Sequence, residues 1–473
     1  MSDAHIKQQL MEYLKMSKDL LTLPHPNPVT ALEEYICDRL GFLQRCTQDY
    51  EGIVPLKLGD EWFCLLTNPD YITQVLKDRM LFIKAKDVQQ LSVFLGNGLL
   101  NSEGDFWLRQ RRLSQPVFHQ EQINSYAAVM VDYTQRMLET WQDGQVHDVH
   151  DAMMRLTLNI VMKTLFNQDV QDTAAENIAH TLDVAMSWVE YQEATNVKLA
   201  LTEIGEVHSL SADMPSEDED MDRRYRDAIT LLDETVYGII KHRRASGTTG
   251  KDLLGMLMQV EDADDGSRMS DKQLRDEAAT LILAGHETTA NALSWTWMLL
   301  AQHPHVQKKL SAELQTVLNG RTPTLADLPQ LTYTNWVIKE SMRLYPPATD
   351  VSREATQDCE IGGYFIPKGT TLIASQWAMH RNSRYFSEPE LFQPERWAND
   401  LEKELPRGVY FPFGDGPRVC IGKSFAIMEA VLLLATIAQK FQMDLVADQN
   451  IELQPSITLR ARYGIQVVLK AAL

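Results

Sequence analysis

One segment constrains this chain more than any other: a glycine-rich loop with a single cysteine that leads directly into an amphipathic helical pattern, FPFGDGPRVCIGKSFAIMEAVLLLATIAQKF. The amino terminus of a helix carries a partial positive charge and free N–H groups, and both stabilise a thiolate. Thiolates are strong ligands for iron. The segment therefore predicts that Cys420 lies at a helix start and serves as a metal ligand.

The other fixed residues of this loop indicate what the cysteine binds. Gly416 and Gly422 let the backbone turn tightly and approach a flat macrocycle closely. Phe413 can cover the sulfur, and the guanidinium of Arg418 matches a carboxylate of the macrocycle. The alternative is an inert buried thiol, but a chance match at every fixed position is rarer than roughly one in a thousand. We therefore expect Cys420 to be the axial ligand of a haem iron.

The pattern F-x-x-G-x-R-x-C-x-G resembles the haem-binding signature of the cytochrome P450 family. A second mark of that family lies upstream, where Glu340 and Arg343 stand on one face of a predicted helix. The resemblance makes them the ExxR pair, with Arg396 as the third member of an ion network. Alone, such a pair would be surface decoration of little energetic value. In this order along the chain, it implies a scaffold that fixes the cysteine loop.

Three further residues resemble the family's partners for the haem propionates. Trp107 and Arg111 lie one helical turn apart, which places an indole N–H and a guanidinium on one face. Arg353, which follows the ExxR helix, matches a third partner. Outside the family context all three would be ordinary residues, since most arginines are exposed.

A long apolar stretch, 276–302, is interrupted by the polar sequence ILAGHETTAN. An alanine–glycine pair is small enough to leave room for dioxygen beside a haem, and the following glutamate and threonine can deliver protons. By resemblance this is the family's oxygen site; a helix kink with a satisfied threonine is the alternative. A zinc-protease HExxH motif fails because residue 290 is alanine. The residues concerned are Ala284, Gly285, Glu287, Thr288 and, beside them, Thr289.

Charge and cysteine content exclude several other classes. A net charge of −20 and a pI near 5.0 disfavour nucleic acids and anionic membranes as partners. The 5 cysteines never form a CxxC pair, which argues against a disulfide framework and a structural zinc site. The amino-terminal residues carry charges in every turn, so we expect no signal sequence and no membrane anchor. A cytoplasmic protein is the expectation.

Two polar clusters have structural rather than functional interpretations. Residues 203–226 contain PSEDEDMDRR and lack apolar periodicity, which predicts an exposed acidic loop between two helices. His147, Asp148, His150 and Asp151 are metal-binding residue types, but they have no distant partner to complete a coordination sphere. We predict a helix start at this second cluster.

The resemblance implies a mainly α-helical, triangular single domain with a small β region. Haem b would lie between the oxygen-site helix and the cysteine-loop helix, in a haem domain of residues 24–473 that follows a helical extension of residues 1–23. The implied reaction is monooxygenation, in which one atom of O2 enters an apolar organic substrate by hydroxylation or epoxidation. A peroxide-driven enzyme, an isomerase of the same fold and a non-catalytic haem sensor or carrier are the alternatives. The glutamate and threonine of the oxygen site favour the monooxygenase.

The segment RARYGIQVVLK predicts a strand, and no flavin or ferredoxin sequence follows it. We therefore expect NAD(P)H electrons to arrive through separate proteins. A ferredoxin or flavodoxin-type donor with its reductase is expected, and the enzyme itself is expected to be a monomer. Arg109, Arg112 and Lys423 form a candidate docking patch. The substrate is expected to be a lipid-like, terpenoid or polyketide molecule, with fatty acids first. The expected pocket residues are Leu91, Val93, Phe94, Leu281, Ala284, Ala348 and Val351.

Overall fold

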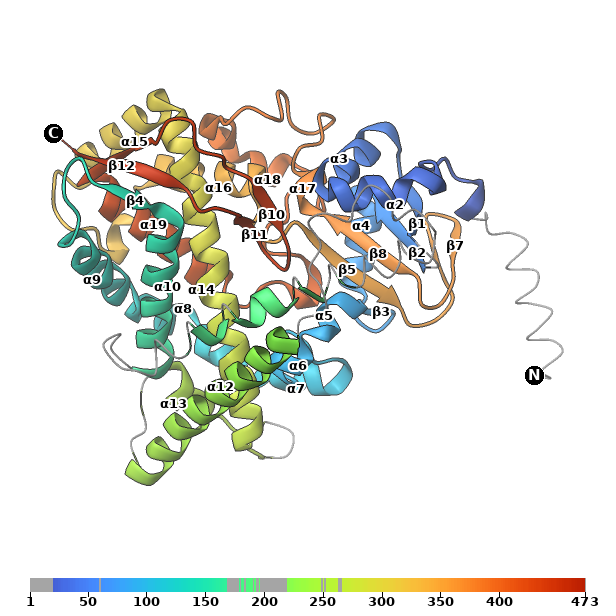
Figure 1. Ribbon diagram of the computed structural model, residues 1–473, viewed down its shortest axis with the longest axis horizontal. Coiled ribbons are helices and arrows are strands. Elements are labelled where there is room, and N and C mark those ends of the chain that lie inside the picture. The colour runs from blue at the N-terminus through green and yellow to red at the C-terminus, as the bar shows by residue number, and fades with distance from the viewer. Residues whose placement is uncertain are drawn as a thin grey trace. The chain divides into compact units, whose positions relative to one another are not determined.

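The computed structural model describes residues 20–58, 61–167, 178, 180–182, 184–189, 191–192, 195, 219–247, 250, 252–262 and 266–472. The chain divides into two compact units (Figure 1). Unit 1 comprises residues 1–90, 349–390 and 402–420, and unit 2 comprises residues 91–348, 391–401 and 421–473. Helices predominate and the strands form small sheets, which confirms the predicted mainly helical class. The single haem domain of residues 24–473 stays a prediction.

Unit 1 is built on a mixed sheet whose described strands follow the order β1-β2-β8-β5-β3. Strands β1 and β2 pair antiparallel with Ile53 opposite Leu66, and residues 59–60 between them lie outside the described residues. Helix α3 buries Phe42 and Leu43 against this sheet. The described elements of unit 1 are η1 (Leu20–Thr22), α2 (Pro28–Cys37), α3 (Arg39–Asp49), β1 (Ile53–Leu58), β2 (Glu61–Leu66), α4 (Pro69–Lys77), β3 (Phe82–Lys84), α5 (Lys86–Gln90), β5 (Asp350–Ala355), β6 (Cys359–Ile361), β7 (Tyr364–Ile366), β8 (Thr371–Ser375), α17 (Gln376–Met379) and η5 (Gly416–Arg418).

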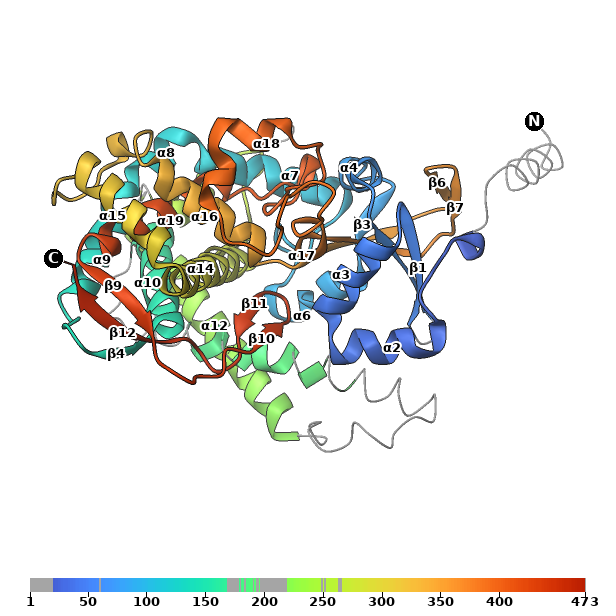
Figure 2. The same cartoon turned by 90° about the horizontal axis from the view of Figure 1, so that it is seen from above.

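Unit 2 is a helical assembly around one long buried helix, α14 (Asp271–Gln302), which contacts α10, α12, α16 and α19 (Figure 2). The other described elements of unit 2 are α6 (Ser92–Leu95), α7 (Gly104–Ser114), η2 (Gln115–Phe118), α8 (Gln120–Ser125), α9 (Ala127–Leu138), β4 (Val146–Asp148), α10 (Val149–Phe166), α12 (Glu219–Ser246), α13 (Leu253–Leu257), α15 (Pro304–Val317), η3 (Leu325–Asp327), α16 (Thr332–Leu344), η4 (Pro394–Asp400), α19 (Lys423–Ala438), β9 (Phe441–Leu445), β10 (Leu453–Pro455), β11 (Leu459–Ala461) and β12 (Gln466–Ala471). Helix α18 (Leu401–Glu404) spans a boundary between the units.

Helix α14 begins with a reciprocal cap. The Ser270 hydroxyl accepts a hydrogen bond from the Gln273 backbone N–H at 3.2 Å, and the Gln273 side chain accepts one from the Ser270 N–H at 2.8 Å. Such a capping box satisfies two of the N–H groups that a helix start leaves open. Further along, Trp295 stacks on Tyr345 of the loop after α16, with ring centroids 4.8 Å apart. These contacts fix the helix that carries the predicted oxygen site.

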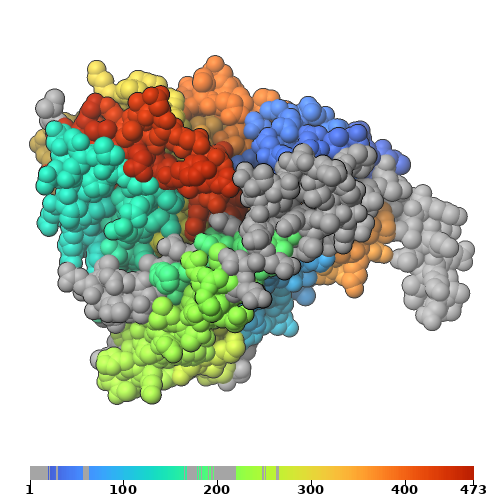
Figure 3. Space-filling view, in the orientation of Figure 1, coloured from blue at the N-terminus to red at the C-terminus, as the bar shows by residue number. Residues whose placement is uncertain are grey.

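The strands of unit 2 bring the end of the chain onto α10. Strand β12 pairs antiparallel with both β4 and β9, and Figure 3 shows the carboxy-terminal segment in red beside the teal segment around α10. The Asp148 carboxylate caps α10 by accepting hydrogen bonds from the N–H groups of His150, at 2.9 Å, and Asp151, at 3.3 Å. The prediction that the cluster His147 to Asp151 marks a helix start is therefore confirmed.

The predicted acidic loop of residues 203–226 is wrong at its carboxy-terminal end. Residues 203–218 lie outside the described residues, but residues 219–226 form the first turns of α12. Tyr225 is buried in this helix and stacks on Trp188 at 4.1 Å, while the Trp188 indole N–H donates to Asp222 at 2.8 Å. Among the acidic residues, Met221, Tyr225 and Ala228 have helical spacing and share one apolar face, which the prediction overlooked.

Of the predicted amino-terminal helical extension, residues 1–19 lie outside the described residues, and Leu20–Thr22 form a 3-10 turn. Among the described residues, no helix combines the length and the apolar character needed to cross a membrane.

Candidate active site

The cysteine loop of unit 1 is held from several sides. Its ends are joined by the Cys420 N–H, which donates to the Phe413 carbonyl at 2.9 Å. The Arg407 guanidinium donates to the Asp415 carboxylate at 2.6 Å, and the Asp415 side chain also accepts from the Gly416 N–H at 2.7 Å. Burial raises the pKa of Asp415, but the hydrogen bond and charge of Arg407 outweigh it and hold this pKa below its usual range. The ion pair between Arg407 and Asp415 thus holds the backbone of the loop at Gly416.

Gly416 packs closely against helix α4. Its φ is +70°, a left-handed conformation that side chains disfavour, and a Cβ at this position would lie 2.2 Å from the Leu76 carbonyl oxygen of α4. Only glycine fits there. The predicted need for glycine at 416 therefore has a physical cause in the protein itself, namely the packing of the loop on α4.

Cys420 differs in its environment from Cys46, Cys64 and Cys359, whereas Cys37 is exposed as Cys420 is. Burial raises the pKa of the Cys46 and Cys64 thiols to about 12, and burial followed by the Asp358 charge raises that of Cys359 to about 11. Those thiols therefore stay protonated at neutral pH and make poor thiolate ligands. Cys420 is exposed, at the end of a loop in which Pro417 is exposed too and Phe413 is partly buried.

Helix α19 begins later than the sequence predicted. Its first residue is Lys423, and Gly422 is the capping residue without a side-chain hydrogen bond, so Cys420 precedes the helix rather than occupying its first turn. The 3-10 turn Gly416–Arg418 and the bond from Cys420 to Phe413 position the cysteine instead.

The predicted oxygen site occupies an uncovered patch of an otherwise buried helix. Within α14, Ala284 is exposed and Gly285 and Thr288 are partly exposed, whereas both neighbouring stretches are buried. Positions 284 and 288 share one face because four residues make about one helical turn. The Thr288 hydroxyl donates a hydrogen bond to the Ala284 carbonyl at 2.8 Å. Its oxygen can still accept a hydrogen bond from a group on the uncovered side.

Glu287 lies on a different face of α14 and is 1% exposed. Its Oε1 accepts hydrogen bonds from Arg460 Nε, at 2.7 Å, and from the Thr458 hydroxyl. Burial raises the pKa of Glu287, but the charge and hydrogen bond of Arg460 outweigh it and hold this pKa below its usual value. Sequence reasoning missed Arg460 and Thr458, because their contacts with Glu287 span more than 170 positions and no local pattern announces them.

The structure brings the three predicted network residues together in unit 2. Arg343 donates to both oxygens of Glu340, from Nε at 2.9 Å and from Nη2 at 2.8 Å, and Arg396 Nε donates at 2.9 Å. The Glu340 carboxylate also accepts from the Gln393 N–H at 3.0 Å and from the Trp397 indole N–H at 3.0 Å. Glu340 and Arg343 are 0% exposed, which excludes surface decoration. The carboxylate ties α16 to η4.

The predicted propionate partners lie on separate elements. Trp107 and Arg111 are on α7 of unit 2, where the indole is buried and the arginine is half-buried. Arg353 is on β5 and Arg418 ends η5, both in unit 1; Arg353 is 7% exposed and donates to the Ser352 carbonyl at 2.8 Å. Their binding of a propionate stays a prediction.

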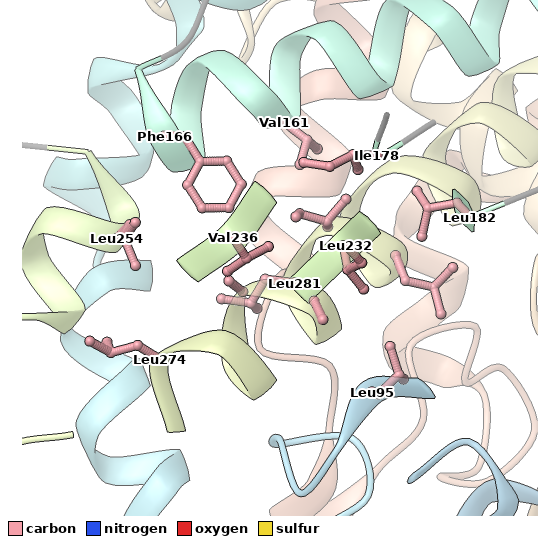
Figure 4. Close-up of a cluster of buried hydrophobic side chains, with 14 of the residues drawn as sticks. Leu95, Val161, Phe166, Ile178, Leu182, Leu232, Val236, Leu254, Leu274 and Leu281 are labelled. Atoms are coloured by element: carbon pink, nitrogen blue, oxygen red, sulfur yellow. The ribbon is translucent and has the colours of Figure 1, made fainter. Parts of the chain in front are cut away.

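Three of the predicted pocket residues, Leu91, Phe94 and Leu281, belong to one buried hydrophobic cluster of unit 2. Figure 4 shows part of this cluster, with Leu281 labelled. Val93 is 62% exposed, so the structure does not place it in that cluster. Ala348 and Val351 are half-buried, the first in unit 2 and the second in unit 1. The lining of a substrate pocket by these residues stays a prediction.

Helix α14 fastens the 91–101 segment through two buried acidic side chains. The Asp276 carboxylate accepts from the Asn97 N–H at 3.0 Å, and Glu277 accepts from the Leu99 N–H at 3.2 Å and from Gln110 Nε2 at 2.9 Å. Arg275 donates to the Phe94 carbonyl at 3.0 Å. These bonds fix the backbone beside Leu91 and Phe94.

The donor set fits a haem. Cys420 offers an exposed thiol in a loop that is closed by its hydrogen bond to Phe413. Separately, α14 carries an uncovered patch of small residues with one hydroxyl. Cys420 would hold the iron, and Arg418, Arg353 and Arg111 are the cations suited to its propionates. A bound haem supplies the oxygen chemistry, and the protein supplies orientation, protons and exclusion of water.

Known proteins resemble this chain over most of its length. The family model described as cytochrome P450 matches residues 35–468. The chain is 35% identical over 391 residues to cyclooctat-9-en-7-ol 5-monooxygenase of Streptomyces melanosporofaciens, covering 83% of this chain and 82% of the relative. It is 30% identical over 406 residues to pentalenene oxygenase of Streptomyces avermitilis, covering 84% and 86%.

Among solved structures, the haem domain of cytochrome P450DA matches with a TM-score of 0.82 and 28% identity, covering 95% of this chain and 98% of that one. The family model, the relatives and the structural match all span most of the chain. The chain therefore belongs to the cytochrome P450 family and is a haem-dependent monooxygenase, which inserts one atom of O2 into an apolar organic substrate with electrons from redox partner proteins.

Proposed function

We propose that this monooxygenase hydroxylates or epoxidises a terpenoid, with Cys420 as the iron ligand and with Glu287 and Thr288 as the residues that deliver protons. The observation that carries the assignment of roles is the uncovered patch of α14, where the Thr288 hydroxyl lies among Ala284 and Gly285. A hydroxyl beside small residues can reach a bound ligand that larger side chains would exclude.

The terpenoid assignment rests on two supports. The names of two relatives give cyclooctat-9-en-7-ol and pentalenene as the compounds that they oxidise. The side chains of Leu91, Phe94 and Leu281 are apolar, so they offer contact area to a hydrocarbon but no charge to the carboxylate of a fatty acid. A terpenoid therefore replaces the fatty acid as the first candidate.

The electron donor that we propose is a ferredoxin or flavodoxin-type protein with an NAD(P)H-dependent reductase. Arg109, Arg112 and Lys423 are the candidate docking residues, but Asp262 neutralises part of this patch. Its carboxylate lies 2.9 Å from Arg109 Nε and 3.6 Å from Arg112 Nη2. The enzyme is proposed to act as a cytoplasmic monomer.

Substrate binding tests the terpenoid proposal. We expect cyclic terpene hydrocarbons and alcohols to give a saturable high-spin shift of the Soret band in the haem-loaded protein, whereas saturated fatty acids give none at equal concentration. Phe94→Ala should weaken terpene binding at least tenfold, or about 1.4 kcal/mol. Tyr237→Ala, which removes a partly exposed ring of α12, should leave the dissociation constant unchanged. A shift with fatty acids alone would contradict the proposal.

A further inference from the structure

One face of α14 is docked on the β11 segment, and Glu287 belongs to that face. Glu287, Asn291 and Trp295 follow one another at intervals of four residues, so they share a side of the helix. Asn291 Nδ2 donates to the Thr458 hydroxyl at 3.1 Å, and the Trp295 indole N–H donates to the Leu459 carbonyl at 3.0 Å. Glu287 completes the row through its bonds with Thr458 and Arg460. The carboxylate is therefore part of a built interface.

The side chains of Glu287 and Thr288 lie on different faces of α14. Consecutive helix residues are about 100° apart around the axis, because 3.6 residues make one turn. Thr288 lies on the partly uncovered face with Ala284, while Glu287 is held against β11. The second oxygen of Glu287, Oε2, is buried without a hydrogen-bond partner among the described residues, so it can accept a proton.

Arg460 is the main cation near Glu287 at neutral pH. Burial lowers the pKa of His286, on the same helix, to about 4, and burial together with the Arg460 charge lowers that of His150 on α10. Both imidazoles are therefore neutral at neutral pH. Arg460, on β11, faces the carboxylate directly, and its side chain is 16% exposed. Through Arg460, a buried carboxylate is in contact with a group that reaches solvent.

We propose that Arg460 is a positioning residue of the proton relay: it keeps Glu287 ionised against β11, where a proton from solvent can reach the carboxylate before passing to Thr288. The proton binds at Glu287 Oε2, and the carboxyl, which is held against β11 while it is ionised, then turns toward the uncovered face of α14. There it releases the proton to the Thr288 hydroxyl, which passes its own proton to the reacting ligand, so the carboxylate is regenerated. No electron is transferred in this step. The inference rests on the proposed roles of Glu287 and Thr288.

Arg460→Gln tests this role, with Arg462→Gln as the matched control. Both substitutions remove one arginine charge from neighbouring positions, but Arg462 is 52% exposed and pairs with Glu452. Arg460→Gln should lower the product formed per NAD(P)H consumed by roughly tenfold, since positioned proton transfer contributes about 10²- to 10⁴-fold. Haem content and substrate affinity should match those of the wild type. Arg460→Lys should recover most of the coupling because it restores the charge.

The pH profile gives a readout that a purely structural role would not move. The wild-type relay needs ionised Glu287, whose pKa Arg460 holds low, so activity falls only at acidic pH. Without Arg460, burial becomes the dominant influence and raises this pKa, so the acidic limb of the profile should move to higher pH. An unmoved limb in Arg460→Gln, or an equal change in Arg462→Gln, would overturn the role of Arg460.

Infrared spectroscopy detects the same change without turnover. Arg460→Gln should gain a protonated carboxyl band at neutral pH that the double variant with Glu287→Gln lacks. Burial raises the pKa of Glu429 on α19 well above its usual value, so its own band should be present in both proteins and cancel in the difference. Absence of a difference band would contradict the proposal.

Two further variants keep the test decisive. If Arg460→Gln does not fold, Thr458→Val removes the other donor to Glu287 and should shift the limb in the same direction by a smaller amount; no shift would overturn the inference. Thr288→Ala separates the two claims. If it retains wild-type coupling, the relay is wrong and the inference falls with it. If it uncouples while Arg460→Gln does not, only the role of Arg460 is wrong.

Discussion

Replacing Glu340 with alanine is expected to yield protein that neither folds stably nor incorporates haem. The substitution leaves Arg343, which is 0% exposed, without its carboxylate, and it removes the acceptor of Arg396. Removing one partner of a buried ion pair costs about 3–5 kcal/mol, a large share of the 5–15 kcal/mol by which folded domains are typically stable. The loss of soluble, haem-loaded protein measures the effect.

A surface pair provides the comparison for Glu340. Asp132 and Arg136 on α9 are 2.7 Å apart with both side chains more than half exposed, so Asp132→Ala should cost less than about 1 kcal/mol. Glu340→Gln keeps an acceptor oxygen but loses the charge. It should therefore lower the free energy of unfolding by more than Asp132→Ala and by less than Glu340→Ala. The network would be dispensable if the Glu340→Ala protein bound haem and its free energy of unfolding lay within about 1 kcal/mol of the wild-type value.

Gly416→Ala is expected to disrupt the cysteine loop far more than Gly414→Ala, although the two glycines have nearly the same φ angle. Their φ angles are +70° and +69°, so each alanine pays a similar left-handed penalty of roughly 1–2 kcal/mol. The added Cβ at 416 would lie 2.2 Å from the Leu76 carbonyl oxygen, whereas at 414 nothing lies within 4 Å. A backbone carbonyl cannot move aside as a flexible side chain can.

The difference between these glycine variants isolates the close approach from the conformational penalty. Urea unfolding of both proteins gives the two free energies, and haem content reports whether Cys420 is still presented. We expect Gly414→Ala to keep its haem and Gly416→Ala to lose most of it. Equal stabilities for the two would mean that the loop can shift away from α4.

The residues that sequence reasoning found are those whose chemistry is local. Phe413, Cys420 and the residues between them lie within one turn-rich segment, and Glu340 and Arg343 lie within one helical turn, so spacing alone places them together. Helix α14 could be predicted from the length and apolar character of its sequence. In each case the relevant geometry is set by a few consecutive residues.

The residues that it missed depend on tertiary packing. Arg460 meets Glu287 only because the β11 segment is hydrogen-bonded to α14, and nothing near Arg460 in the sequence differs from an ordinary strand. The helical start of α12 was hidden because its acidic residues face solvent while Tyr225 finds an aromatic partner in Trp188. Cys420 precedes its helix because the loop is fastened to α4 and to its own Asp415, a constraint that no helix signal carries.

The central claim is that Cys420 holds a haem iron as a thiolate, and the carbon monoxide difference spectrum of the dithionite-reduced protein tests it most directly. We expect a strongly red-shifted Soret band in the wild type that is lost in Cys420→Ser, because thiolate donation to iron causes the shift. Cys37→Ser, at the other exposed cysteine, should keep the band. An unshifted band in the wild type, or a red-shifted band that survives in Cys420→Ser, would contradict the assignment.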